Sequence, residues 1–378
     1  MPDHDDQDDA GASSPDSGMP GGEGESDVMR FHRPTPLVGK PRVSVVIPCY
    51  RYGAYLPDAV ASVLDQDGLD VDVLVVDDAS PDDSADVARS IAAVDRRVSV
   101  LVHEVNAGHI QTYNDGLARA TGDYVVLLSA DDLLPRNALT RAVSLMEAHP
   151  RVGFVYGYAR SFTQVPDPAP DVTRSWTVWE GHDWVRRSAR SGRCFLSSPE
   201  AVMRREALQQ TDLYDPRLPH SGDFDMWLRT AARWDVGRVN GPIQAHYRVH
   251  DANMHLTSYA GWLTDLEARR LTFDIFFDER AADLPEVAGL RPVARRAMAR
   301  EALRRARHAA RDADSADAGE DYLRFARATW PQVTGTTGWA LTSLALAGDN
   351  HARAAGPRRQ ASRVREHLAW RRERRWGV

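Results

Sequence analysis

Apolar residues between positions 43 and 132 follow two alternating patterns. Short runs rich in β-branched residues predict strands, and they occupy residues 43–48, 72–78, 98–103 and 123–132. Segments with helical apolar spacing separate them, at residues 55–66, 84–95 and 112–120. Apolar strands that alternate with helices of about a dozen residues indicate a parallel sheet with right-handed crossovers. The fold class expected is therefore α/β, with a mostly parallel sheet flanked by helices.

The pattern is looser after residue 150. VGFVYGYARSF predicts a strand that leads into the Pro-rich residues 166–170, and RCFLSSPEAVMRREALQQ predicts a loop running into a helix that Pro199 helps to start. DFDMWLRTAARW predicts an amphipathic helix, and VGRVNGPIQAHYRVH predicts an extended segment. Beyond about residue 257 the chain is rich in Ala, Arg and Leu and is expected to be mostly helical, with a break at Gly356-Pro357.

Charge divides the 378-residue chain into regions. Residues 1–28 carry nine acidic residues and no Lys or Arg, a composition that predicts disorder, whereas residues 351–378 carry nine Arg. We expect a disordered acidic tail over 1–40, a catalytic domain over 41–256 with halves 41–135 and 136–256, and a helical region with a basic tail over 257–378. The net charge of −7 is modest.

Two cysteines imply no disulfide framework and favour a reducing compartment. The acidic start does not resemble a signal peptide, and the apolar run GWALTSLALAG is about half a membrane span. We therefore expect a cytoplasmic protein, at most peripheral to a membrane.

Pairs of acidic residues stand where two predicted strands end. Asp131 and Asp132 follow the apolar run 125–128, and Asp77 and Asp78 close the second strand. Adjacent carboxylates at the end of a buried strand repel and lose hydration, so we expect a cation between Asp131 and Asp132. In parallel sheets, ligands bind beyond the carboxyl ends of the strands. A helix cap is the alternative for Asp131-Asp132, although capping needs one Asp, and DDASPDDS would also suit a turn.

Four segments occur in an order that is more specific than any one of them. VSVVIPCYRYGAYLPDAVASVLDQ, VLVVDDASPDDS, NAGHIQTYNDGLARATGDYVVLLSADD and SGDFDMWLR together resemble the family 2 glycosyltransferases of GT-A fold. The resemblance covers roughly residues 42–255. It implies a Rossmann-like GT-A sheet and an inverting transfer from a nucleotide sugar, usually with a divalent metal such as Mn²⁺ or Mg²⁺.

The resemblance gives roles to residues at the strand ends. Asp132 corresponds to the metal-binding position and Asp131 to the one nearer the ribose, and a hard cation there would neutralise the diphosphate. Asp78 corresponds to the residue that meets the base. A carboxylate accepts the imide N–H of uracil or thymine, which favours a UDP or dTDP sugar, although a guanine N–H could also be met. Pro48 and Tyr50 lie where the family stacks against the base, with plain packing as the alternative for Tyr50.

The resemblance also places the catalytic base. Asp223 in SGDFDMWLR matches that position, and one carboxylate is sufficient to deprotonate the acceptor hydroxyl. Asp225 is a rival, expected instead to be a structural partner. His250 fits a Tyr-Arg-x-His pattern and is the expected metal ligand, with packing or phosphate contact as alternatives, and His246 shares its face. Around Asn114 the family often has Ala-Arg-Asn, so no donor contact is assigned there.

Three other functions fit the sequence less well. A receiver-like domain needs a lysine after the last strand, and the only lysine, Lys40, precedes the first. Nucleotidyl transfer needs a Gly- and Arg/Lys-rich triphosphate loop, which PCYRYGAY is not. A catalytically silent nucleotide-sugar-binding module is disfavoured because Asp78, Asp131, Asp132 and Asp223 occur together.

The expected partners are a nucleotide-sugar donor and a glycan, lipid-linked glycan or small glycoside acceptor. The C-terminal RRQASRVREHLAWRRERRW interleaves Arg with Trp and could contact an anionic membrane surface, with a solvated helix as the alternative. No fold signal supports binding to nucleic acid.

Overall fold

The computed structural model describes residues 30–168, 170–196, 198–254, 257–310 and 316–347. The strands are β1 (Arg30–His32), β2 (Arg42–Cys49), β3 (Asp70–Asp77), β4 (Val98–Val102), β5 (Tyr124–Leu127), β6 (Val152–Phe162), β7 (Ser175–Trp179), β8 (Val202–Arg204) and β9 (Asp235–Arg248). The helices are α1 (Leu56–Leu64), α2 (Ser84–Val94), α3 (His109–Leu117), α4 (Ala138–Ala148), α5 (Gly181–Ser191), α6 (Arg205–Gln210), α7 (Gly222–Ala231), α8 (Trp262–Ile275), α9 (Pro285–Ala288), α10 (Arg291–Ala309), α11 (Ala316–Thr329) and α12 (Thr337–Ala347).

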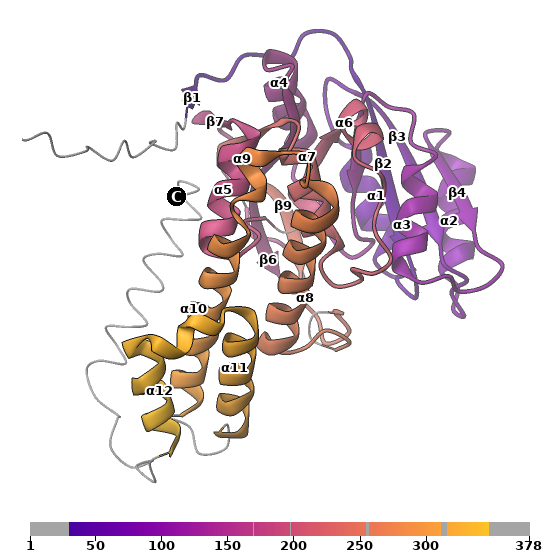
Figure 1. The fold of residues 1–378 in the computed structure, drawn as a ribbon. Helices are drawn as coiled ribbons and strands as arrows, with labels where there is room; N and C mark the ends of the chain where they lie inside the picture. The colour runs from indigo at the N-terminus through magenta and orange to yellow at the C-terminus, as the bar shows by residue number, and fades with distance from the viewer. Residues whose placement is uncertain (1–29, 169, 197, 255–256, 311–315, 348–378) are drawn as a thin grey trace, which may run out of the picture.

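Within the described ranges, nine strands form one mixed sheet in the order β1-β7-β9-β6-β8-β5-β2-β3-β4. β2 pairs in parallel with β3 and β5, β3 with β4, and β6 with β9. The pairs that involve β1, β7 or β8 with their neighbours are antiparallel. Figure 1 shows β2–β4 with α1–α3 on one side of the molecule, and α10–α12 extending away from the sheet. The predicted α/β class, with its mixed, mostly parallel sheet, is confirmed.

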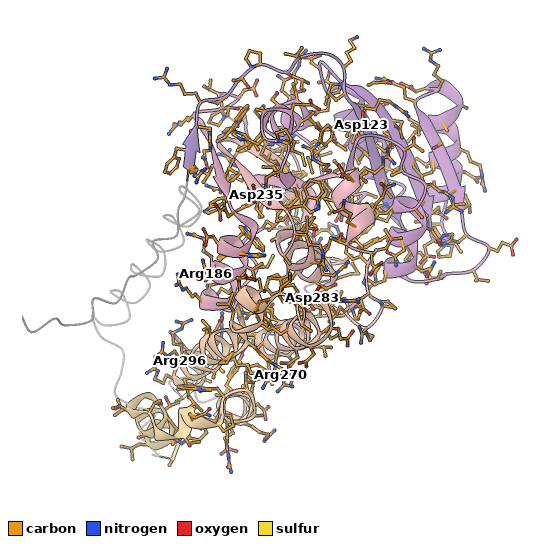
Figure 2. All side chains as sticks on the ribbon, turned by 45° about the horizontal axis from the view of Figure 1, so that its top comes forward. Asp123, Arg186, Asp235, Arg270, Asp283 and Arg296 are labelled. Atoms are coloured by element: carbon orange, nitrogen blue, oxygen red, sulfur yellow. The ribbon has the colours of Figure 1, made fainter. Side chains whose placement is uncertain are left out.

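Helices cover both faces of the sheet, because the side chains of its strands alternate between two apolar cores. In β2, Val43, Val45 and Ile47 enter the core shared with α1, α2 and α4, whereas Val46 enters the core shared with α3, α5 and α7. With both faces covered, the ends of the strands are left for a ligand. Asp123 precedes β5 and Asp235 begins β9, so the amino ends of these strands lie in the upper part of Figure 2.

The first predicted elements agree closely with the structure, except at two boundaries. α3 begins at His109 rather than at residue 112, because Gly108 adopts a left-handed φ of 82° at its N-cap. Gly116 then lets α3 approach β2, since a Cβ there would lie 2.3 Å from Val46 Cγ1. β5 ends at Leu127, so the acidic pair 131–132 lies in a turn beyond the strand.

The prediction for residues 193–210 was wrong in one respect. Ser198–Glu200 form only a 3₁₀ turn, and the helix starts at Arg205. Strand β8 lies between the two, and its backbone pairs antiparallel with both β5 and β6. Hydrogen bonds to β5 on one side and β6 on the other satisfy the backbone N–H and C=O groups of β8, and a strand therefore forms where the start of the helix was expected. β7 and α5 were also not predicted from the looser pattern.

The C-terminal helices belong to the same core as the second half of the sheet. Phe273 of α8 packs edge-to-face on Phe224 of α7, with ring centroids 5.1 Å apart. Met298 and Ala302 of α10 are buried in the same cluster. Of the helices that the structure describes, none is long and apolar enough to cross a membrane.

The predictions for the two terminal regions can be compared with the structure only in part. Residues 30–32 form β1, which pairs with β7, so ordered structure begins before residue 41, where the catalytic domain was expected to start. The acidic residues 1–28, the break at Gly356-Pro357 and the basic C-terminal tail lie outside the described residues.

Candidate active site

The carboxyl ends of β2, β3 and β5 meet at one edge of the sheet. Cys49 at the end of β2 pairs with Asp77 at the end of β3, and Val46 of β2 pairs with Leu127 at the end of β5. The three following loops therefore lie side by side. Arg51 and Ala79 in two of these loops have left-handed φ values of 62° and 53°. Such backbone is costly for residues with a Cβ and is concentrated at functional sites.

A cavity of about 680 Å³ lies beside these loops, and Pro48, Tyr50 and Asp78 are among its lining residues. Tyr50 is 44% exposed, so its ring is available to a planar ligand. The three residues that the sequence assigns to the nucleobase are thus brought together around one cavity. We call it the nucleotide chamber.

Asp78 is buried and tied to the start of α3. Its Oδ1 accepts a hydrogen bond from the backbone N–H of Ala107 at 2.7 Å, and its Oδ2 accepts one from Gly108 at 2.9 Å. His103 Nδ1 lies 2.9 Å from the same Oδ1. The backbone carbonyl of Asp78 accepts from the Asn106 side chain at 3.2 Å. These partners fix the carboxylate at the wall of the nucleotide chamber.

Asp131 and Asp132 are positioned by the end of β9. Leu133 and His246 exchange backbone hydrogen bonds of 3.0 and 2.8 Å, which joins the turn after β5 to this strand. The backbone N–H of Arg248 then donates to Asp132 Oδ1 at 2.8 Å, and its Nε donates to the carbonyl of Asp131 at 2.8 Å. The acidic pair is therefore held rigidly despite its like charges.

Asp132 is 1% exposed, and its Oδ2 has no hydrogen-bond partner. Burial, and then the charge of Asp131, raise the pKa of Asp132 well above its ordinary value. A buried carboxylate oxygen without a partner is a costly arrangement unless a ligand completes it. A hard divalent cation has the chemistry that fits, since it takes oxygen ligands and removes the repulsion.

No group of three or more His, Cys, Asp or Glu among the described residues is arranged to hold a metal by itself. A cation at Asp132 would therefore take most of its ligands from phosphate oxygens and water, as Mg²⁺ commonly does.

His250 contacts the acidic pair as a donor. Its Nδ1 accepts from the backbone N–H of Ala252 at 3.2 Å, so its Nε2 carries the proton that faces Asp131 Oδ2 at 3.0 Å. Asn253 donates to the same oxygen at 3.3 Å. Metal ligation by His250 would require that the bond to Asp131 be given up, and it stays a prediction. His246 instead packs against Phe162, with ring centroids 6.0 Å apart.

Asp223 lies in the first turn of α7. Its Oδ1 accepts from the Tyr214 hydroxyl at 2.6 Å, and its Oδ2 accepts from the Ser198 hydroxyl. Asn114 of α3 makes two hydrogen bonds with the backbone of Tyr214, at 2.8 and 2.9 Å. Asn114 is thus a support for Tyr214.

Asp225 has a different environment. It is fully buried, and its Oδ2 accepts from Arg229 Nε at 2.7 Å. The two other nitrogens of this guanidinium donate to the carbonyls of Asp212 and Leu213. Asp225 is therefore committed to an internal ion pair, as the sequence led us to expect.

A second cavity of about 550 Å³ brings the acidic pair and Asp223 together, since Asp131, Asp132 and Asp223 all line it. We call it the acceptor chamber. It shares lining residues with the nucleotide chamber, namely Pro48, Tyr52, His109, Tyr113, Ser129 and Met254. The two chambers therefore adjoin, and the acidic pair lines the acceptor chamber beside the residues that they share.

Sequence reasoning missed Tyr214, Ser198 and His103 as neighbours of the acidic residues. Tyr214 precedes Asp223 by nine positions, Ser198 precedes it by 25, and His103 follows Asp78 by 25. No spacing rule connects such pairs, so no signal in one sequence could have identified them.

Comparison with known proteins identifies the family of the region that contains this site. The model of glycosyl transferase family 2 matches residues 44–211, which contain the strand-end loops and the acidic pair 131–132. This region of the chain belongs to glycosyltransferase family 2. Family 2 membership makes it a nucleotide-sugar-dependent glycosyltransferase of class EC 2.4.

Two curated relatives show how far this family 2 likeness extends. An uncharacterized glycosyltransferase, alr2836 of Nostoc sp., is 28% identical over 227 residues, which cover 57% of this chain and 67% of the relative. Glycosyltransferase GlyG of Streptococcus pneumoniae is 33% identical over 122 residues, which cover 32% of this chain and 40% of the relative. The aligned part is therefore less than half of GlyG.

Solved structures of similar fold align with a larger share of this chain than the curated relatives do. TarS 1-349 of S. aureus in complex with UDP has a TM-score of 0.52 at 17% identity, covering 81% of this chain and 87% of TarS. The mannosyltransferase PcManGT of Pyrobaculum calidifontis, in complex with GDP-Man and Mn²⁺, has a TM-score of 0.53 at 17% identity, covering 92% and 90%. These likenesses establish the fold.

Proposed function

We propose that this glycosyltransferase moves a sugar, with inversion, from a UDP or dTDP sugar to a hydroxyl group of a glycan, lipid-linked glycan or small glycoside. The observation that carries the proposal is the shared lining of the two chambers. Asp78 lines the nucleotide chamber, and Asp131, Asp132 and Asp223 line the acceptor chamber that adjoins it. A sugar joined to a diphosphate at Asp132 would thus have its anomeric carbon within the acceptor chamber.

The residues that line the nucleotide chamber support a UDP or dTDP sugar as the donor. Tyr50 and Pro48 offer surfaces on which a base can stack, and Asp78 Oδ2 can accept an imide N–H. Uracil and thymine carry that N–H, whereas cytosine has a lone pair at the same position. TarS has been solved with UDP and with UDP-GlcNAc, and PcManGT with GDP-Man, which supports a nucleotide-sugar donor for a chain of this fold.

The residue that would hold the metal is Asp132, through its unpartnered Oδ2, while Asp131 beside it would lie nearer the ribose, and His250 would join the metal only if it gave up its bond to Asp131. A Mn²⁺ or Mg²⁺ ion bound there would neutralise charge that develops on the leaving diphosphate. His250, Asn253 and Arg248 orient the acidic pair through the hydrogen bonds described above. They would hold both carboxylates in place whether or not the donor is bound.

Asp223 would act as the general base. The acceptor oxygen forms a bond to the anomeric carbon while the bond from that carbon to the diphosphate oxygen breaks, and the nucleoside diphosphate leaves with the electron pair. The acceptor proton passes to a carboxylate oxygen of Asp223. Tyr214 and Ser198 each donate to one oxygen of Asp223, so the carboxylate cannot turn away from the chamber.

The acceptor chamber favours an uncharged, hydroxyl-rich acceptor. Its walls include the rings of Tyr113, Tyr214 and Tyr259, on which the apolar face of a sugar can pack. Among the described lining residues, Arg269 is the one Arg or Lys, and it is already paired with Asp265 at 2.6 Å and Glu301 at 3.2 Å. A phosphorylated or uronic acid acceptor would therefore find no unpaired Arg or Lys on the described wall.

The test is a donor and acceptor screen of the full-length protein in Mn²⁺. UDP-glucose, UDP-galactose, UDP-GlcNAc and a dTDP sugar are each offered with a neutral glycan or with an anionic glycan, and release of nucleoside diphosphate is measured. We expect release with a UDP or dTDP donor, stimulated by the neutral glycan, and an inverted anomeric centre by NMR. Absence of release with every pair, or a retained anomeric centre, would refute the proposal.

A further inference from the structure

Helix α12 lies at the tip of the C-terminal extension and carries no charged residue. Its sequence is TGWALTSLALA, and Figure 1 shows it at the end of the α10–α12 extension, away from the sheet. One side of α12 is buried: Thr342 is fully covered, and a Cβ at Gly338 would lie 3.6 Å from Leu303 Cδ1 of α10. A helix that is apolar all round is ordinarily buried on every side. A partner is therefore expected for its remaining side.

The outer side of α12 presents leucines to solvent. In the described part of the chain, Leu341 is 58% exposed and Leu344 is 71% exposed. Ala340 and Ala345 are also exposed, and positions three and four apart on a helix lie on the same face. We call these four residues the leucine face. Contiguous exposed apolar surface is typical of a contact with a protein or a membrane.

Arginines of α10 lie beside this helix. Arg300 and Arg307 stand three positions before and four positions after Leu303, so they flank it on the side of α10 that contacts α12. Arg300 is exposed and Arg307 half-buried, and neither guanidinium forms an ion pair or hydrogen bond within the described residues. The described residues of α10, α11 and α12 contain nine Arg and only four Asp or Glu. The apolar helix therefore adjoins a surface of net positive charge.

This charge determines which partner suits the surface. An isologous dimer through α12 would use the same patch twice and bring the arginines of both copies together. The C-terminal residues 351–378, with nine Arg and two Glu, would meet the same repulsion. Nucleic acid would pair with the arginines but leave the leucines in water. An anionic lipid bilayer satisfies both, because it offers an apolar boundary for leucine and phosphate groups for arginine.

We propose that α12 and the adjoining side of α10 form a membrane-docking surface, in which Leu341 and Leu344 enter the interface of an anionic bilayer and Arg300 and Arg307 contact its lipid phosphates. An eleven-residue helix is roughly 16 Å long, too short to span a bilayer, so the attachment is peripheral and reversible. None of these four residues lines either chamber, so the proposal goes beyond the proposed function and is independent of it.

The experiment is flotation of the full-length protein with vesicles, either of phosphatidylcholine alone or of an equimolar mixture with phosphatidylglycerol, at low and at high salt. One variant combines Leu341→Ser with Leu344→Ser and removes the apolar contact. A second combines Arg300→Gln with Arg307→Gln and removes the charges. The basic C-terminal tail is present in every sample, so a difference between samples reports on α12 and α10.

A matched control carries the same kinds of substitution elsewhere on the surface. It combines Val94→Ser with Arg96→Gln at the end of α2, where Val94 is 86% exposed and Arg96 is also exposed. Circular dichroism confirms that each variant is folded. Sedimentation velocity without lipid shows whether a variant has lost contact with a second copy of the chain.

We expect the wild type and the control to float with the anionic vesicles, and high salt to weaken this binding. The leucine variant should lose at least about tenfold in partition coefficient at both salt concentrations. The arginine variant should lose about tenfold or more with anionic vesicles at low salt, and show little change at high salt.

Two results would overturn the proposal. If the wild type does not float, or if the leucine variant floats as well as the wild type, α12 does not dock on a membrane. If the leucine variant instead changes from a dimer to a monomer in sedimentation while its flotation is unchanged, the leucine face is a contact between copies of this chain.

Discussion

Asp132 should affect nucleotide binding and protein stability in opposite directions. In the presence of Mn²⁺, Asp132→Asn should weaken the affinity for UDP, because an amide is a poorer ligand for a hard cation than a carboxylate. Without metal, the same change should stabilise the fold. Asp132 is buried next to Asp131, its Oδ2 has no partner, and its pKa is raised well above the ordinary value, so this carboxyl group destabilises the fold at neutral pH and the substitution removes that cost.

The magnitudes follow from this environment. Loss of a metal ligand should weaken Mn²⁺-dependent binding of UDP at least about tenfold, or about 1.4 kcal/mol. Removal of one of two buried like charges should increase the free energy of unfolding by on the order of 1 kcal/mol. For a chain of this length, that corresponds to a rise in Tm of about 1–2 °C. The backbone N–H of Arg248 can still donate to the remaining oxygen, so the turn should keep its conformation.

The two effects are measured by calorimetric titration of UDP in Mn²⁺ and by thermal unfolding in EDTA. Asp123→Asn is the control, because Asp123 is an exposed carboxylate that precedes β5, at the opposite end of the strand (Figure 2). Unchanged affinity for UDP in Asp132→Asn would refute the assignment of the metal. A lower Tm in EDTA would show that Asp132 has a structural role instead.

Three further predictions concern the support of the site. Tyr214→Phe removes the donor 2.6 Å from Asp223 Oδ1, so kcat should fall about tenfold at unchanged affinity for UDP, and equal loss in both would contradict this role. Asp225→Asn leaves Arg229 buried without its charge partner, so urea unfolding should show a loss of about 3 kcal/mol or more, whereas a loss below 1 kcal/mol would contradict the ion pair. Burial opposes ionisation of Glu301, but Arg269 and Arg193 outweigh it and lower its pKa to about 2 from the ordinary 4.5. The ionised Glu301 therefore contributes about 3 kcal/mol to the free energy of unfolding, a contribution that is complete above pH 4.5 and is lost as the pH falls toward 2. Glu301→Gln should thus destabilise the protein at pH 7 and have little effect near pH 2. A destabilisation that does not change with pH would contradict the ion pairs.

The sequence predicts those parts of the molecule in which local pattern and tertiary environment agree. β2 is buried on both faces, so it appears as a nearly continuous apolar run that ends where the strand ends. β8 is three residues long and depends on its two neighbours for its hydrogen bonds, so no local pattern indicated it. Pro199 suggested a helix start because its own φ suits one, but the ladder of β8 intervenes.

The site shows the same division. The identities of Asp78, Asp132 and Asp223 could be proposed from motifs that follow strands or begin a helix. Their partners could not, because the partners come from distant segments that only the fold brings together. His250 illustrates the limit: the sequence placed it near the acidic pair, but only the contact of its Nδ1 with the backbone of Ala252 shows that Nε2 is a donor.

The central claim is that one carboxylate serves the donor and another serves the acceptor. The most direct measurement compares Asp223→Asn with the wild type in two assays, UDP affinity by calorimetry and release of UDP from the active donor with a neutral acceptor. We expect unchanged affinity and a turnover lower by about 10²–10⁴-fold, because a general base acts on the acceptor and not on the nucleotide. Wild-type turnover in Asp223→Asn, or a loss of UDP affinity as large as the loss of turnover, would contradict the account.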